Sequence, residues 1–76
     1  MTGQIIKILP DKGYGFIESS GIEYFFHKSD FNGHWFDLIN DYGQSKRIPV
    51  NFVTKSSDRG PRAAQVTRLD FPNQAS

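Results

Sequence analysis

The feature that most constrains this chain is a pair of short runs of large side chains separated by a turn. The runs are residues 12–17 (KGYGFI) and residues 22–28 (IEYFFHK), and the segment between them is Glu-Ser-Ser-Gly. Side chains alternate between the two faces of a β-strand, and a short polar linker with glycine is typical of a tight connection. The two runs are therefore predicted to pair as an antiparallel hairpin.

Both faces of this hairpin carry large apolar side chains. The face assigned to the core holds Ile17, Ile22, Tyr24 and Phe26. The second face holds Tyr14, Phe16, Phe25 and His27, with Lys12 and Lys28 beside them. A core needs only one apolar face, so the rings and cations of the second face are not required for folding. They are the main indication of function in this sequence.

Three further strands are predicted on either side of a long connection. They cover residues 4–9, 47–54 and 62–69, with Ile48, Val50 and Phe52 on one face of the middle one and Pro49 marking an edge or bulge. Five short strands with turns between them predict an all-β fold, a five-stranded antiparallel Greek-key barrel of the oligonucleotide-binding type. The barrel is expected to take up residues 1–70, and the tail at 71–76 is expected to be frayed.

The connection over residues 29–46 allows two interpretations. Ser29 and Asp30 can cap a single helical turn, whereas residues 35–40 have the pattern of a short amphipathic helix. A connection this long in so small a domain is often functional. Its aspartates at positions 30, 37 and 41 are interpreted as solvated turn residues.

Composition removes several classes of function. The chain has 76 residues and no cysteine, which excludes disulfides, thiolate zinc sites and a cysteine nucleophile and fits a reducing cytosol. The N-terminal residues lack a signal-peptide pattern, and no membrane span, cofactor motif or catalytic constellation is recognised. His27 and His34 lack metal-ligand spacing. A net charge of +1 implies that the placement of charges matters more than their sum.

Three segments in order resemble the bacterial cold-shock protein family. Residues 12–17 and 24–27 look like its two ribonucleoprotein motifs, and residues 59–66 (RGPRAAQV) look like the stretch that leads into its last strand. The resemblance extends from about Gly3 to Leu69. It implies a barrel that binds single-stranded RNA or DNA without catalysis.

The sequence departs from the family at three positions of interest. Lys7 stands where the family usually has an aromatic residue, and Ile8 and Lys28 stand where it usually has Phe. At least two stacking rings are therefore expected to be missing. A ring from the long connection usually joins the binding face, and Trp35 or Phe36 is the candidate here.

The predicted nucleic-acid-binding residues fall into three groups. Bases would stack on Tyr14, Phe16, Phe25 and His27. Phosphates would contact Lys7, Lys12, Lys28, Arg59 and Arg62. Glu23 would accept a hydrogen bond from a base edge, and Pro61, Trp35 and Phe36 complete the set.

Structural alternatives exist for several of these residues. Phe16 and Phe25 could belong to the core, His27 could be an ordinary surface or core histidine, and Lys28 could be a solvated strand end. One ring of the pair Trp35 and Phe36 could plug the end of the barrel. Gly13 and Gly15, outside the predicted site, are more simply explained by bends or close backbone approach than by ligand contact.

The predicted function is that of a cytoplasmic, monomeric RNA chaperone or cold-shock-type regulator. Its partner would be single-stranded RNA or DNA, with no membrane or small-molecule ligand. Fewer rings predict weaker and more salt-sensitive binding than is usual in the family. The alternative is a protein-interaction module on the same barrel.

Overall fold

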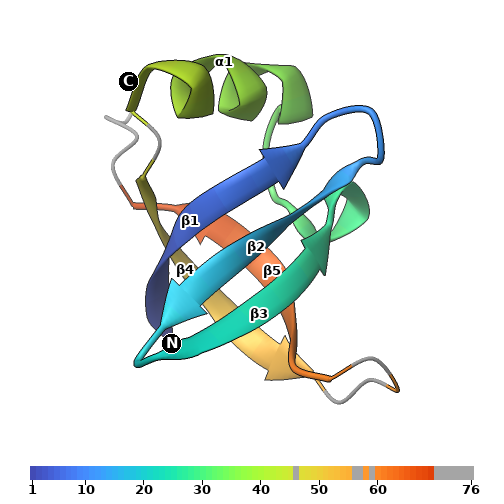
Figure 1. The fold of residues 1–76 in the computed structure, drawn as a ribbon, viewed down its shortest axis with the longest axis vertical. Helices are drawn as coiled ribbons and strands as arrows, with labels where there is room; N and C mark the ends of the chain where they lie inside the picture. Colours follow the sequence, from blue (N-terminus) through green and yellow to red (C-terminus); the bar gives the residue numbers. More distant parts are fainter. Residues whose placement is uncertain (46, 56–57, 59, 70–76) are drawn as a thin grey trace.

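The chain folds into a closed β-barrel with one helix across its end (Figure 1). The structure, a computed structural model, describes residues 1–45, 47–55, 58 and 60–69. The strands are β1 (Thr2–Leu9), β2 (Tyr14–Ser19), β3 (Ile22–His27), β4 (Ile48–Lys55) and β5 (Arg62–Arg68). Their order around the barrel is β1-β2-β3-β5-β4. The predicted fold class is confirmed, although one contact, between β3 and β5, is parallel rather than antiparallel. The predicted frayed tail lies outside the described residues.

The β2–β3 hairpin is closed by a two-residue turn. Ser19 pairs with Ile22, and the residues between them, Ser20 and Gly21, have φ angles of 52° and 81°. Positive φ at both central positions is the pattern of a type I′ turn, whose twist matches that of the flanking strands. The turn fixes the register in which Tyr14 faces His27 and Phe16 faces Phe25.

The core fills the inside of the barrel. Its buried cluster consists of Ile5, Ile8, Ile17, Tyr24, Phe26, Phe31, Leu38, Ile48, Val50, Phe52, Ala63 and Val66. The predicted inward faces of the second, third and fourth strands are thus confirmed, with one exception. Ile22 is exposed, because it lies at the turn end of the hairpin, where the alternation runs past the core.

A β-bulge in β1 resets which side chains point inward. Ile5 pairs with Ile17 and Lys7 pairs with Phe16, so Ile6 has no partner residue in either ladder of β1. A bulge adds one residue to one strand and shifts the alternation beyond it. As a result Ile5 and Ile8 are both buried, whereas Lys7 is exposed.

The connection between β3 and β4 contains both of the elements that the sequence allowed. A 3₁₀ turn, η1 (Lys28–Asp30), is followed by the helix α1 (Trp35–Ser45), which is longer than the predicted 35–40. Its inward stripe is Trp35, Leu38, Ile39 and Tyr42, at helical spacing, and packs on the core. The helix lies across the end of the barrel (Figure 1). In the described part of the chain, no helix is long and apolar enough to cross a membrane.

Candidate nucleic-acid interface

Four ring-bearing side chains on the outside of the barrel come together around one shallow hollow. It is lined by Tyr14 and Phe16 from β2 and by Phe25 and His27 from β3. All four are half-buried, and none belongs to the core cluster. The interpretation of Phe16 and Phe25 as core residues is therefore excluded. We call these four residues the ring surface.

The rings of this surface touch each other but leave faces open. Tyr14 and Phe16 pack edge-on with centroids 5.9 Å apart, and Phe16 and Phe25 do so at 6.2 Å. Tyr14 and Phe25 are tilted at 51° with centroids 5.1 Å apart. In edge-to-face and tilted contacts the rings are not stacked flat on one another, so each neighbour covers only part of a ring face. The remaining area can take a flat, π-bonded partner.

Three lysines surround the ring surface. Lys7 pairs with Phe16 across the β1–β2 ladder because of the bulge. Lys12 lies in the turn before β2, and Lys28 begins η1, where its N–H donates to the Gly13 carbonyl at 2.8 Å. All three are exposed, and none takes part in an ion pair within the described residues. Their charges are thus available to an anionic partner.

Two carboxylates lie at the opposite end of the same hairpin face. Glu18 and Glu23 pair directly across the β2–β3 ladder, and the Glu18 side chain accepts a hydrogen bond from the Gly21 N–H. Glu23 is exposed. The face therefore changes from positive, near Lys12 and Lys28, to negative near the turn. Glu23 is in a position to accept a hydrogen bond at the negative end.

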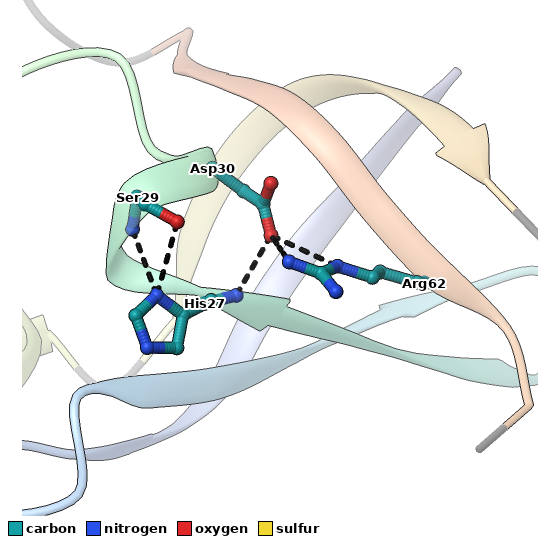
Figure 2. A network of polar contacts seen from close by, with 4 residues as sticks. All are labelled: His27, Ser29, Asp30 and Arg62. Atoms are coloured by element: carbon teal, nitrogen blue, oxygen red, sulfur yellow. Dashed lines mark hydrogen bonds and ion pairs between the residues drawn. The ribbon is translucent and has the colours of Figure 1, made fainter. Parts of the chain in front are cut away.

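The imidazole of His27 is held by the turn that follows it (Figure 2). Its Nδ1 accepts a hydrogen bond from the Ser29 N–H at 3.2 Å and lies 3.0 Å from the Ser29 hydroxyl oxygen. A backbone N–H can only donate, so Nδ1 is the acceptor, and the neutral ring carries its proton on Nε2. His27 thus presents an N–H donor away from the turn.

Arg62 lies beside the ring surface but already has a partner (Figure 2). Its guanidinium donates to the Asp30 carboxylate, and its side chain is 32% exposed. The neighbouring Pro61 is exposed, and its carbonyl accepts the Phe25 N–H at 3.1 Å. Arg59, which the sequence also suggests as a phosphate contact, lies outside the described residues.

The two rings of the long connection have different environments. Trp35 packs edge-on against Phe26 in the core, with centroids 6.1 Å apart, and helps to close the end of the barrel. Phe36 is 80% exposed. Neither lines the hollow of the ring surface. Trp35 thus closes the end of the barrel, as one of the structural alternatives stated, and Phe36 is a solvent-exposed ring on α1.

The interpretation of the loop aspartates as solvated turn residues is wrong for Asp30 and Asp41 and only partly right for Asp37. Asp30 pairs with Arg62, and Asp41 pairs with Arg68 of β5. Asp37 is exposed but lies in α1 rather than in a turn. Tertiary contacts across more than twenty residues determine these pairs, and no local pattern shows them. A local signal for Asp30 did exist: a polar residue three positions after His27 is the spacing of a capping box.

The described residues include no group of three or more His, Asp or Glu side chains that could hold a metal ion.

Comparison with known proteins agrees with a nucleic-acid-binding barrel. Residues 1–69 match the model of a family described as "'Cold-shock' DNA-binding domain". The chain is 39% identical over 69 residues to the cold shock-like protein CspLB of Listeria monocytogenes, covering 90% of this chain and 97% of that one. It is 36% identical over 70 residues to the cold shock-like protein CspE of Bacillus anthracis, covering 91% and 97%.

Proposed function

This chain belongs to the cold-shock DNA-binding domain family, a nucleic-acid-binding and non-enzymatic family, and on that premise we propose that it binds single-stranded RNA or DNA on the ring surface. The observation that carries the proposal is the hollow lined by Tyr14, Phe16, Phe25 and His27. None of these rings belongs to the buried cluster that fills the barrel. Unpaired bases expose π-faces that such rings can stack on.

The three lysines around the ring surface supply the second part of the mechanism. Phosphates of a strand lying across β2 and β3 would contact Lys7, Lys12 and Lys28 while its bases lie on the rings. Lysine–phosphate contacts release counterions, so binding weakens as salt rises, with a slope of about −0.7 per contact for single strands. Glu23 would accept a hydrogen bond from a base edge, and His27 would donate one from Nε2.

A cellular role follows from preference for unpaired strands. A protein that binds single-stranded segments better than paired ones shifts RNA from hairpins toward open states, by as much as the two affinities differ. This is the action of an RNA chaperone, which we propose for this chain, together with a cytoplasmic location and a monomeric state. Lys7 and Lys28 stand where relatives usually have rings, so the binding is expected to be weaker and more salt-sensitive than theirs.

Titration of a fluorescent pyrimidine-rich oligonucleotide at two salt concentrations tests the proposal. Each stacked ring contributes about 1–3 kcal/mol, so Phe16→Ala and Phe25→Ala are each expected to weaken binding by roughly 5- to 150-fold. Phe36→Ala is the matched control, since Phe36 is exposed but lies outside the ring surface. Absence of binding at low salt, or equal losses in all three variants, would contradict the proposal and favour a protein-interaction role for the barrel.

A further inference from the structure

One carboxylate oxygen ties together three segments at the edge of the ring surface (Figure 2). The Oδ2 atom of Asp30 accepts hydrogen bonds from the His27 N–H at 3.0 Å and from the Nε and Nη2 of Arg62 at 3.1 and 2.9 Å. The donors come from the end of β3 and the start of β5, and the acceptor comes from η1. The Asp30 side chain is only 11% exposed. Hydrogen bonds between charged groups are the stronger ones, and limited exposure reduces their screening.

The same guanidinium also contacts a ring of the ring surface. The Cζ atom of Arg62 lies 5.7 Å from the centroid of the Phe25 ring, within the range of a cation–π contact. Arg62 and Phe25 are partners in the parallel ladder between β5 and β3. The guanidinium therefore lies between Asp30 and Phe25, held by hydrogen bonds on one side and in contact with the ring on the other.

This geometry bears on how Arg62 could act in binding. Asp30 takes hydrogen bonds only from the Nε and Nη2 of Arg62, so other N–H groups of the guanidinium are left for a ligand. While the pair is intact, however, the carboxylate offsets the charge of the guanidinium, and breaking the pair would leave a largely buried carboxylate without its counter-charge. The main effect of Arg62 on a ligand is therefore expected to pass through Phe25. The same carboxylate also holds η1 to the backbone N–H of His27, the last residue of β3.

We propose that Arg62 is a positioning residue, held by Asp30, that orients Phe25 and the His27 turn for base stacking, and that it is not a phosphate contact. This rests on the proposed function, because it assigns a role within the same ring surface. It predicts that losing the Asp30–Arg62 pair lowers affinity without changing the number of phosphate contacts.

The test measures how oligonucleotide affinity varies with salt in matched variants. The charge-neutral double variant Asp30→Asn/Arg62→Gln is expected to bind about two- to fivefold more weakly, as for loss of one exposed cation–π contact, with an unchanged salt slope. Lys12→Gln, the control, is expected to reduce the magnitude of the negative salt slope by about 0.7. In a Phe25→Ala background the double variant is expected to cause a smaller loss, because only its effect on the His27 turn remains. A slope reduced by about 0.7 in the double variant, or an undiminished loss in the Phe25→Ala background, would overturn the inference.

Two further measurements keep the test decisive if the double variant does not fold. Arg62→Lys keeps the charge but not the planar fork, so its affinity is expected to fall as in the double variant, whereas a phosphate contact would be preserved by lysine. In the unaltered chain, the NMR signal of the Arg62 Nε–H is expected to stay in place when oligonucleotide is added, and a large shift would overturn the inference. Failure of the unaltered chain to bind at low salt would instead contradict the proposed function, and this inference with it.

Discussion

The hydrogen bond between α1 and the bulge of β1 gives the sharpest prediction about stability. The Tyr42 hydroxyl donates to the carbonyl of Ile6, the bulged residue, at 3.0 Å. The substitution Tyr42→Phe removes this donor and leaves the rest of the ring in place. It therefore tests whether the helix holds the bulge, separately from whether the helix packs on the core.

The expected change in the free energy of unfolding follows from the hydrogen bond that the Ile6 carbonyl loses. A hydrogen bond contributes about 0.5–1.5 kcal/mol net, and a buried group left without a partner costs about 1–3 kcal/mol. The site is partly buried, so we expect the free energy of unfolding to fall by about 1–2 kcal/mol. In a domain of this size, that lowers Tm by about 5–15 °C.

Thermal unfolding followed by circular dichroism measures the loss, and Tyr14→Phe is the matched control. The Tyr14 hydroxyl has no hydrogen-bond partner within the described residues, so its removal is expected to change Tm by less than about 2 °C. The bulge also turns Lys7 outward, next to Phe16, so Tyr42→Phe is expected to weaken oligonucleotide binding in the same way as Lys7→Gln. Equal Tm values for the parent and Tyr42→Phe would refute the reasoning.

Three further predictions concern the packing of two glycines, a tautomer and the plug. A Cβ on Gly15 would lie 2.6 Å from a carbonyl oxygen of β1, so Gly15→Ala is expected to lower the free energy of unfolding by about 2 kcal/mol or more. A Cβ on Gly43 of α1 would have nothing within 4 Å, so Gly43→Ala is expected to raise the free energy of unfolding by about 0.5–1 kcal/mol. Urea unfolding of both glycine variants measures these opposite changes. In ¹⁵N NMR spectra at neutral pH, the neutral His27 ring is expected to be protonated on Nε2, and a proton on Nδ1 would show that the bond from the Ser29 N–H is absent. Trp35 fluorescence is expected to change on unfolding but not when oligonucleotide is added; quenching by the ligand would place Trp35 at the interface.

The position of the ring surface was predictable from sequence because it depends on short-range geometry. Alternation along two strands and a type I′ turn between them are enough to place Phe16 opposite Phe25 and Tyr14 opposite His27. The family resemblance rests on the same local motifs. The barrel followed from the number and spacing of strands, since closing the sheet removes exposed strand edges.

Alternation could not predict which side chains point into the barrel beyond a bulge. Strict alternation from Ile5 would put Lys7 inside the barrel and Ile8 outside, yet the structure has the reverse. Ala63 and Ala64 are likewise both buried, next to Gln65 with a φ angle of 51°. A bulge is stabilised by neighbours that are distant in sequence, such as Tyr42 for the bulge of β1, and so leaves little local trace.

The long connection shows the same division between local and tertiary information. Helical spacing indicated part of α1, but its packing on the core decided that Trp35 closes the barrel while Phe36 remains in solvent. Asp30 and Arg62 are 32 residues apart, and only the barrel brings them to the edge of the ring surface. The sequence by itself determined which strands carry the rings and that the rings share one face. Tertiary structure decided which charges surround them, because long-range pairing and burial select the partner of each charged side chain.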